Sequence, residues 1–291
     1  MLPEMLRVGS IGLGDMGAPI AHRVVEAGFP LTVFDLEPSA VNDLTAAGAV
    51  AASNSRELAA ASDVVILCVV DDDQVRAVVD QSLVGAMTPG SVLLVVSSVR
   101  PNTIREVVAS LGPGGVQVID APVSGSRPAA AAGTLTLMLG GDEADIARVR
   151  PVLEAFGKEL FHVGGHGAGQ AMKIANNIML HMNHLVALEA LRFAVSQGIE
   201  EKTLIEVVNT GSGRSWVTET WGLIDEMFHN HPQAGTPGIY EMMTKEMWNA
   251  VLLSKATQTS LPLTGVGVQV ARSLLSEREV ALGISPTRDE R

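Results

Sequence analysis

The segment GAGQAMKIANNIMLHMNHL (Gly167–Leu185) places one lysine, Lys173, inside a long and mostly apolar stretch. Burying an ammonium group is costly unless an opposite charge or a chemical role compensates. Lys173 is therefore either a structural lysine, ion-paired or with its head in water, or a group that donates and accepts a proton. Asn177 follows one helical turn later, so both side chains point the same way. The residues alone leave both interpretations open.

Two histidines extend this polar stripe. On a helix, Lys173, Asn177, His181 and His184 fall within a sector of about 80°. We consider two hypotheses: that His181 or His184 contacts a substrate or tunes Lys173, or that both are hydrogen-bonded at a domain or subunit interface. A histidine pair three residues apart could bind a metal ion, but no third ligand is evident, so we predict no metal site.

A second chemical signal lies near the start of the sequence, where Gly12, Gly14 and Gly17 have the spacing G-x-G-x-x-G. A predicted strand precedes them and a helix follows. The first glycine permits a tight turn, the second lets a pyrophosphate approach the backbone, and the third lets helix and strand pack closely. We predict that this whole segment binds a dinucleotide: Gly12, Leu13, Gly14, Asp15, Met16 and Gly17.

Asp35 ends the next predicted strand, 18 residues after Gly17. Its carboxylate would hydrogen-bond both ribose hydroxyls of NAD and would repel the 2′-phosphate of NADP. The following DLEPSA contains no arginine to offset that repulsion. We therefore predict NAD as the cofactor in preference to NADP.

The elements that position these residues change character along the chain. Up to about residue 165, continuous apolar runs alternate with helix-like segments, which predicts a doubly wound α/β sheet covered on both faces and built of parallel strands. The predicted strands are 7–11, 31–35, 63–70, 91–98, 115–123, 134–141 and 158–164. The predicted helices between them are 17–28, 39–48, 55–62, 72–87 and 102–112.

Beyond residue 165 the strand signal stops. One helical pattern runs from Gly167 to about Ser196, and further helices follow to about Gly283. The long helix is apolar on almost every side, which predicts that both domains bury it. We predict an N-terminal Rossmann-type NAD-binding domain at 1–165. An all-α domain for substrate binding and oligomerisation follows at 166–291, joined to the first by the long helix.

Composition narrows the possible functions. The 291 residues are 47% hydrophobic, and the net charge of −12 argues against a nucleic-acid partner. We expect no secretory signal and no membrane span, because no basic leader and no uninterrupted apolar run of about 18–20 residues is visible. The single cysteine, Cys68, fits a reducing cytoplasm and a buried apolar position.

Three further motifs follow the glycine segment GLGDMGAPIA in a known order: DAPVSGS (Asp120–Ser126) with AGTLTLMLGG after it, GAGQAMKIANN (Gly167–Asn177) and, more weakly, MTKEM (Met243–Met247). Over nearly its whole length the chain resembles the β-hydroxyacid dehydrogenases, the family of 3-hydroxyisobutyrate dehydrogenase and tartronate semialdehyde reductase. 6-Phosphogluconate dehydrogenase is a more distant relative. The resemblance implies an NAD-dependent oxidoreductase that transfers hydride between nicotinamide and a small β-hydroxy acid or its semialdehyde.

The resemblance also implies residue roles. Lys173 would be the catalytic acid and base, which requires its pKa to be lowered, as desolvation does for a lysine. Asn177 would hydrogen-bond the substrate, and Ser124 and Gly125 would bind its carboxylate through a hydroxyl and backbone N–H groups. The remaining cofactor contacts implied are Val70 with Asp71 at a strand end, Ser98 beside the nicotinamide, and Lys245 near its ribose.

The chain departs from the family pattern at three places. Ser126, followed by Arg127, stands where a second glycine is usual, Glu246 where aspartate is usual, and Gly238 where an aromatic residue is common. These departures weaken the assignment of a named substrate more than that of the reaction. Arg127 either faces solvent or binds a second anionic group, and Trp216 either lines the pocket or packs in the core.

Two rival functions remain. An imine reductase would have a similar architecture, but such enzymes usually lack the lysine and prefer NADPH, so Lys173 and Asp35 count against it. A non-catalytic dinucleotide-binding module of the same fold is expected to have lost the lysine. Because the helical domain is so apolar, we also expect a homodimer or homotetramer.

Overall fold

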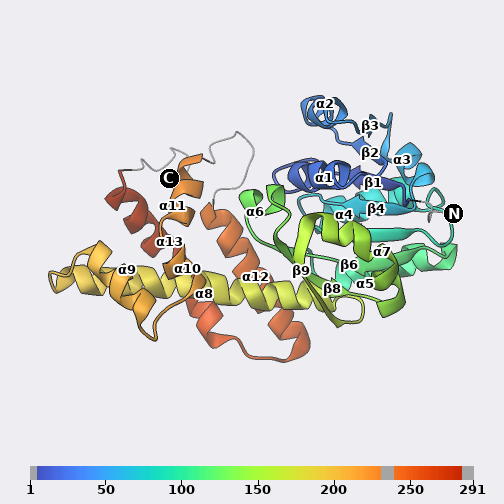
Figure 1. Ribbon diagram of the computed structural model, residues 1–291. Coiled ribbons are helices and arrows are strands. Elements are labelled where there is room, and N and C mark those ends of the chain that lie inside the picture. Colours follow the sequence, from blue (N-terminus) through green and yellow to red (C-terminus); the bar gives the residue numbers. More distant parts are fainter. Residues whose placement is uncertain (1–4, 231–238, 284–291) are drawn as a thin grey trace. The chain divides into compact units, whose positions relative to one another are not determined.

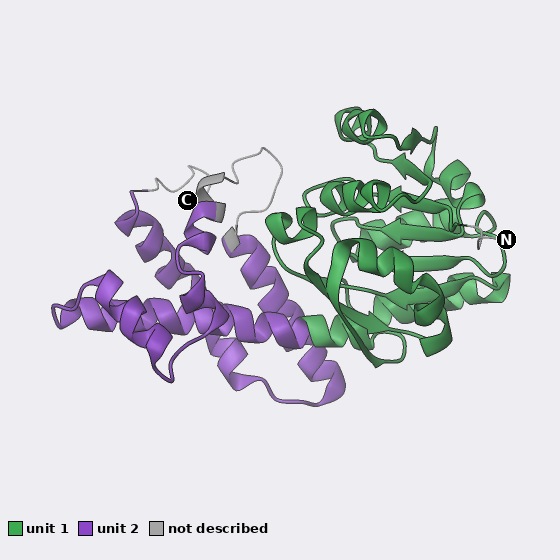
Figure 2. Cartoon of the chain, viewed as in Figure 1, with its two compact units in different colours: residues 1–173 green, residues 174–291 purple. Residues whose placement is uncertain are grey.

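The computed structural model describes residues 5–230 and 239–283, so that Gly238 lies outside the described residues. The chain divides into two compact units, Met1–Lys173 and Ile174–Arg291 (Figure 2). The first unit contains the sheet and the second contains only helices among its described residues. Each unit is described by itself below.

A sheet of nine strands forms the centre of the first unit (Figure 1). Its order is β3-β2-β1-β4-β5-β6-β8-β7, with β9 paired to β8, and the first six positions repeat the strand order of a doubly wound dinucleotide-binding sheet. The strands are β1 Val8–Ile11, β2 Leu31–Phe34, β3 Val50–Ala51, β4 Val64–Leu67, β5 Val92–Val95, β6 Gln117–Asp120, β7 Val123–Ser124, β8 Leu135–Gly140 and β9 Gly157–Gly164.

The continuous apolar runs are explained by burial on both faces of this sheet. In β4, Val64 and Ile66 belong to one core cluster, whereas Val65 and Leu67 belong to the other. Successive side chains of a strand point to opposite faces, so a strand covered on both sides needs an apolar residue at every position. The predicted α/β fold is thus confirmed for this unit.

Helices cover the two faces in separate groups. Ile20, Leu44, Ala130 and Ile146, from α1, α2, α6 and α7, pack into one cluster. Leu58, Val75 and Ile104, from α3, α4 and α5, pack into the other. The bounds are α1 Gly17–Glu26, α2 Pro38–Ala46, α3 Ser55–Ala61, α4 Asp72–Val78, α5 Pro101–Leu111, α6 Arg127–Ala131 and α7 Glu143–Phe156, with a π-helical turn Val79–Leu83 and a 3-10 turn Gly112–Gly114.

The structure corrects the sequence-based prediction in several elements. The expectation of parallel strands throughout is wrong at β8, which runs antiparallel to β6 and β7 because the chain turns back after the short β7 and α6. The helix α7 and the two-residue edge strand β3 were not predicted. The predicted helix 72–87 ends as α4 at Val78 and continues only as the π-helical turn.

The long predicted helix is α8, Ala168–Ser196, and it crosses the division between the units. The other helices of the second unit are α9 Glu201–Thr210, α10 Trp216–Glu219, α11 Leu223–Asn230, α12 Ile239–Thr257 and α13 Pro262–Ala281. Helices α8, α12 and α13 pack together through a small core of buried residues: Leu185, Leu188, Met243, Met247, Val268, Ala271, Leu274 and Leu275.

An ion-pair network joins three of these helices. The Arg278 guanidinium on α13 donates to Glu201 of α9 and to Asp225 of α11, with bonds of 2.7–3.2 Å. Burial alone would lower the pKa of Arg278, but the bonds to both carboxylates outweigh it and raise the pKa. The Trp221 indole donates to Glu201 at 2.6 Å and also lies under the guanidinium. The network fixes the packing of α9, α11 and α13.

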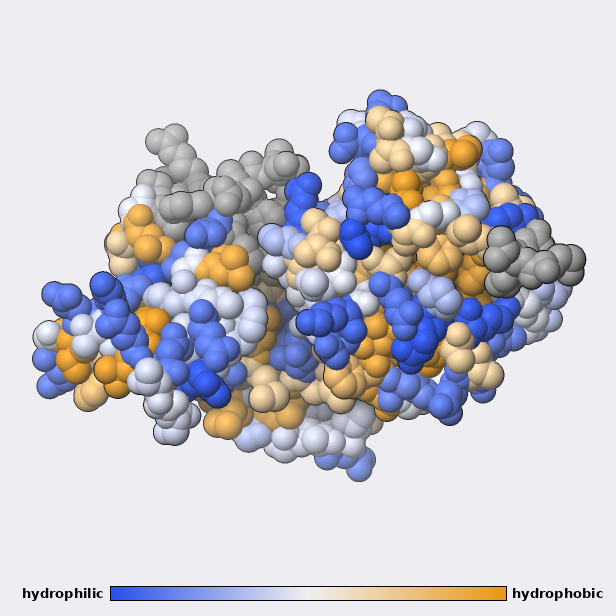
Figure 3. All heavy atoms as spheres, in the orientation of Figure 1, coloured by the Kyte–Doolittle hydropathy of each residue, from blue (hydrophilic) through white to orange (hydrophobic). Residues whose placement is uncertain are grey.

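The expectation that both domains bury α8 does not hold for one of its faces. Met179, Val186 and Phe193 repeat every seven residues and are 68%, 57% and 68% exposed. Only one face of the helix packs into the core of the second unit, and Figure 3 shows hydrophobic side chains among hydrophilic ones on the surface of this unit. By length and composition α8 is also the one described helix that could cross a membrane, a test that core helices of soluble proteins pass as well.

Candidate functional site

The glycine segment forms the turn between β1 and α1, and its first and third glycines are required by close backbone contacts. Gly12 has a φ of 89°, in the left-handed region, and a Cβ built there would lie 2.2 Å from the carbonyl oxygen of Cys68. A Cβ on Gly17 would lie 2.0 Å from the carbonyl oxygen of Gly12. Any side chain at either position would therefore force the turn apart.

Gly14 is different, because a Cβ built there meets no atom of the described chain within 4 Å. Gly14 and Asp15 are both exposed at the N-terminal end of α1. Space above a glycine backbone, at a helix N-terminus, is what a dinucleotide pyrophosphate needs. The residues present therefore fit the cofactor that the spacing predicts.

Asp35 lies at the end of β2 and faces this turn. Its carboxylate accepts hydrogen bonds from the backbone N–H of Leu13 at 2.6 Å and of Glu37 at 2.8 Å. These bonds hold the carboxylate at the rim of the glycine turn, partly accessible to solvent. That is the place where a ribose-binding carboxylate is needed in a dinucleotide site.

The ends of β4 and β5 carry Val70 and Ser98, both exposed. The preceding residue, Ser97, is instead buried, and its hydroxyl accepts from the N–H of Val69 at 2.8 Å. Parallel strands bring their carboxyl ends to one edge, so Val70 and Ser98 share the edge at which the glycine turn lies. The structure thus brings most of the predicted cofactor residues together within the first unit.

Two residues whose roles the sequence did not reveal anchor the first turns of α8. The Asp120 carboxylate at the end of β6 accepts from the N–H of Gly167 at 2.8 Å and of Gln170 at 3.0 Å. Burial raises the pKa of Asp120, although both N–H bonds act in the opposite direction. Asp120 begins the DAPVSGS motif, but only the fold shows that it caps the helix that carries Lys173.

Gln170 ties the same turn to β5. Its amide donates to the carbonyl oxygen of Ser97 at 2.8 Å and accepts from the N–H of Val99 at 3.0 Å. These two residues flank Ser98, so the side chain of Gln170 brackets it. Lys173, partly buried, follows Gln170 by three residues on the helix. The signal that the sequence offered for this contact was a glutamine within a mostly apolar helical pattern.

Ser124 and Gly125 lie at the end of the short strand β7. Gly125 has a φ of 135°, and a Cβ built on it would lie 2.7 Å from Leu135 Cδ2. The next turn begins α6, where Arg127 is 70% exposed and its guanidinium lies 3.8 Å from the Asp15 carboxylate of the glycine segment. Arg127 therefore faces solvent beside the cofactor turn, with an exposed carboxylate as its neighbour.

In the second unit a separate group of polar side chains surrounds Asn177. The Asn177 amide donates to Glu246 Oε2 at 2.8 Å, and His181 Nε2 lies 2.6 Å from the same oxygen. Asn177 and His181 are buried on α8, and Glu246 belongs to α12. The neighbouring Lys245 is exposed on α12. The sequence identified Glu246 only as a departure from the family pattern.

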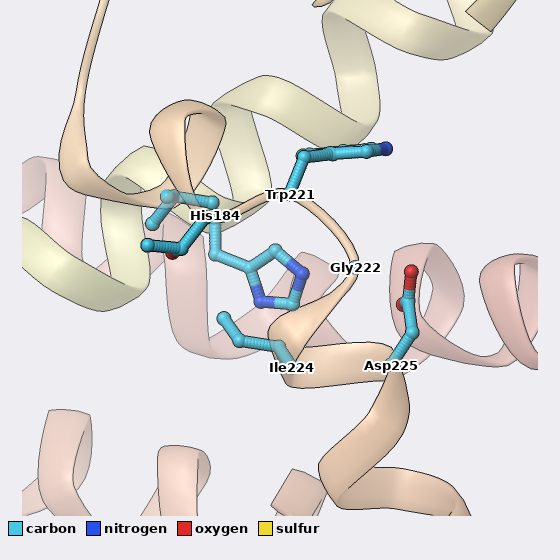
Figure 4. Close-up of a pocket in the computed structure, with 7 residues that line it drawn as sticks. His184, Trp221, Gly222, Ile224 and Asp225 are labelled. Atoms are coloured by element: carbon cyan, nitrogen blue, oxygen red, sulfur yellow. The ribbon is translucent and has the colours of Figure 1, made fainter. Parts of the chain in front are cut away.

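His184 does not join this group. Its ring borders a cavity of about 10 Å³, and Ile224 and Gly222 lie beside it, with Asp225 further along the same segment (Figure 4). Its Nδ1 has no hydrogen-bond partner among the residues described. Burial lowers the pKa of His184 to about 4, with Asp225 acting in the opposite direction. His184 is thus a buried neutral histidine at neutral pH.

Two open questions from the sequence concern Trp216 and metal binding. Trp216 begins α10 and is 49% exposed, so it is not a core residue of the described chain. Across 5–230 and 239–283, no group of three histidine, cysteine or acidic side chains could hold a metal ion.

Comparison with known proteins covers both units. Residues 7–164 match the family described as the NAD binding domain of 6-phosphogluconate dehydrogenase. Residues 167–284 match the family described as NAD-binding of NADP-dependent 3-hydroxyisobutyrate dehydrogenase. The NAD-dependent L-serine dehydrogenase of Pseudomonas aeruginosa is 36% identical over 278 residues, covering 94% of this chain and 93% of that protein.

Two further relatives extend this match. The mitochondrial 3-hydroxyisobutyrate dehydrogenase of Drosophila melanogaster is 34% identical over 272 residues, covering 92% of this chain and 83% of that protein. The structure of Mycobacterium tuberculosis 3-hydroxyisobutyrate dehydrogenase with L-serine superposes with a TM-score of 0.83 at 30% identity, and the match covers 94% of each chain.

Imine reductases share the fold at a greater distance. An imine reductase variant from Myxococcus stipitatus, solved with NAD+, matches with a TM-score of 0.67 at 19% identity. At that identity the likeness shows the fold alone. The hydroxy-acid dehydrogenases, at 34–36% identity, are the better match to the whole chain.

Proposed function

Because the chain belongs to the β-hydroxyacid dehydrogenase family and is an NAD-dependent oxidoreductase of CH–OH groups, we propose that Lys173 is its general acid and base. The observation that carries this proposal is the anchoring of α8. Asp120 caps the first turn, and Gln170 binds the backbone on both sides of Ser98, so Lys173 follows directly after a turn fixed at the sheet edge.

The proton chemistry follows from the reaction. Bound NAD supplies the hydride acceptor at C4 of its nicotinamide. During oxidation, the neutral Lys173 amine removes the proton of the substrate hydroxyl; during reduction, its ammonium returns a proton to the carbonyl oxygen. A lysine suits both steps when partial burial destabilises its charged form.

We assign the substrate contacts to three residues. Asn177, one turn beyond Lys173, hydrogen-bonds the reacting oxygen. The Ser124 hydroxyl and the Gly125 N–H bind the carboxylate, since hydroxyl and backbone donors can hold an anion without a local positive charge. Support for the second assignment comes from accessibility, because Gly125 is exposed and Ser124 is partly exposed at the end of β7.

The cofactor contacts proposed are the glycine segment for the pyrophosphate, Asp35 for the adenosine ribose, Val70 and Ser98 along the strand ends, and Lys245 for the nicotinamide ribose. Asp35 favours NAD because its carboxylate would repel a 2′-phosphate. On this basis residues 1–165 form the NAD-binding domain, and residues 166–291 the domain for substrate binding and oligomerisation.

The substrate proposed is a small β-hydroxy acid, and relatives that are named for L-serine or 3-hydroxyisobutyrate support this class. The test is NAD reduction with 3-hydroxyisobutyrate, glycerate, serine, threonate and 3-hydroxypropionate. On the best of these, Lys173→Ala should lower kcat by about 100-fold or more, because one acid–base group is removed. NADH binding should stay unchanged.

The matched control is Lys255→Ala, an exposed lysine near the end of α12. It removes the same charge away from the proposed site and should retain full activity. If Lys173→Ala keeps full activity, the mechanism is wrong. If the wild-type chain binds NADH but turns over no hydroxy acid or semialdehyde, the non-catalytic alternative is favoured.

We also propose a homodimer or homotetramer formed through the helical unit. Support comes from the exposed side chains of Met179, Val186 and Phe193, which recur every seven residues along α8. Large exposed apolar patches mark association surfaces. Analytical ultracentrifugation of Phe193→Glu should show a smaller species than the wild type. An unchanged sedimentation coefficient would argue against this surface.

The proposed location is the cytoplasm, without a membrane or nucleic-acid partner. The single cysteine, Cys68, supports this, because it cannot form an intrachain disulfide, which fits a reducing compartment. The net charge of −12 argues against nucleic acid. Cell fractionation of the tagged protein is the direct measurement.

A further inference from the structure

The group formed by Asn177, His181 and Glu246, here called the Asn177 cluster, lies entirely within the helical unit. Asn177 and His181 are only 6% and 4% exposed, and the Glu246 side chain is 24% exposed. Both contacts converge on one atom, Glu246 Oε2, at 2.8 Å from the Asn177 amide nitrogen and 2.6 Å from His181 Nε2. The cluster therefore links one helical turn of α8 to α12.

The carboxylate determines which way the Asn177 amide points. A carboxamide has a donor end and an acceptor end, and an ionised carboxylate can only accept hydrogen bonds. Glu246 therefore selects the NH2 end of Asn177. The acceptor end is occupied as well, because Asn176 donates to Asn177 Oδ1 at 3.1 Å. Both ends of the amide are thus specified by neighbours.

His181 in turn fixes the carboxylate. A glutamate side chain has several rotatable bonds, and ordering it costs conformational entropy. A buried imidazole that donates to Glu246 Oε2 restricts the carboxylate to the rotamer that also reaches Asn177. Replacing His181 with an apolar residue would release that oxygen and leave the Asn177 amide with a looser partner.

We propose that His181 and Glu246 are positioning residues, which act through Glu246 Oε2 to orient the Asn177 NH2 group so that its second N–H binds the reacting oxygen of the substrate. This rests on the function proposed above for Asn177. It assigns the two histidines of α8 to different roles. His181 serves the reaction through Asn177, and His184, three residues later, contributes only to packing.

The test is a double-mutant cycle on kcat/KM with the best substrate of the screen, using His181→Leu, Asn177→Ala and the double variant. His181→Leu should lower kcat/KM by roughly 10- to 100-fold, the loss expected for a hydrogen bond to a charged group. In the Asn177→Ala background, His181→Leu should lower kcat/KM by less than about 3-fold, because Asn177, through which His181 acts on the substrate, is already absent. His181→Gln, which keeps an N–H donor, should restore most of the activity.

The matched control is His184→Leu, the same substitution on the same helix away from Glu246, which should leave kcat/KM unchanged at neutral pH. Melting temperatures of all variants show whether each one is folded. The proposal is overturned if His181→Leu is fully active, if its effect multiplies with that of Asn177→Ala, or if His181→Gln is as impaired as His181→Leu. An active Lys173→Ala enzyme would refute the proposed function instead, so the two failures are distinguishable.

Discussion

The glycine turn of the first unit and the Asn177 cluster of the second serve one proposed reaction but are built in different ways. The turn is made of backbone, and two of its three glycines are required because a Cβ would lie 2.0–2.2 Å from a carbonyl oxygen. The cluster is made of side chains from α8 and α12, which join only when those helices pack.

This difference explains why one site could be found in the sequence and the other could not. A backbone site excludes most residue types, so it leaves a fixed spacing of glycines within one short segment. A side-chain site allows many residue types and draws its members from distant segments. Asn177 and Glu246 are 69 residues apart, and nothing in their spacing predicts that they meet.

The largest effect is expected from Gly17→Ala compared with Gly14→Ala. Alanine at position 17 places a Cβ against the Gly12 carbonyl. We therefore expect the free energy of unfolding to fall by about 3 kcal/mol or more and NAD binding to be lost. Alanine at 14 meets no described atom, so the melting temperature should stay unchanged while NAD affinity falls about 10-fold or more, because the methyl group occupies the pyrophosphate space.

Thermal melts and NADH titration by fluorescence measure both effects. If Gly14→Ala binds NADH like the wild type, the pyrophosphate does not approach the backbone at Gly14. The open space at Gly14 would then not be required for cofactor binding.

A second effect concerns a buried side chain of the helical unit. Burial lowers the pKa of His184 to about 4, whereas in the unfolded chain it stays near 6.5. Between these values the unfolded chain binds more protons, so the free energy of unfolding falls as the pH drops. His184 should account for a loss of about 3 kcal/mol between pH 6.5 and pH 4.

Urea denaturation of the wild type and of His184→Leu over this pH range measures that contribution. The variant should show a flatter pH dependence by about this amount. Equal slopes for the two proteins would mean that folding does not lower the pKa of His184.

The smallest effect is expected from Asp120→Asn, which changes a side-chain anchor in the same unit as the glycine turn. Asparagine keeps one acceptor but faces the second N–H with a donor, so stability should fall by about 2 kcal/mol and kcat/KM with it. The matched control is Asp142→Asn, since Asp142 caps the exposed start of α7 through the N–H of Ala144. Its kcat/KM should stay unchanged.

Chemical denaturation and steady-state kinetics of both variants give the comparison. An Asp120→Asn enzyme with normal kcat/KM would show that Lys173 does not depend on the capped turn of α8.

The helices and strands, like the two sites, differ in how far the sequence predicts them. Runs such as 63–70 predicted buried strands correctly, because a strand covered on both faces is apolar at every position. The reversal at β8 could not be foreseen, since an apolar run does not encode its direction. The apolar α8 was expected to be buried by both domains, but one of its faces is exposed, because composition does not distinguish a buried apolar face from an exposed one.

The sequence by itself determined the α/β-then-α organisation, the dinucleotide turn at Gly12, Gly14 and Gly17, and the placement of Lys173 and Asn177 on one side of a helix. These depend on local backbone geometry and on side-chain periodicity, which act within a short segment. Only the tertiary structure decided that Asp120 and Gln170 anchor α8, and that Glu246 joins His181 to Asn177. Those contacts depend on how distant elements pack, and residue spacing does not encode that packing.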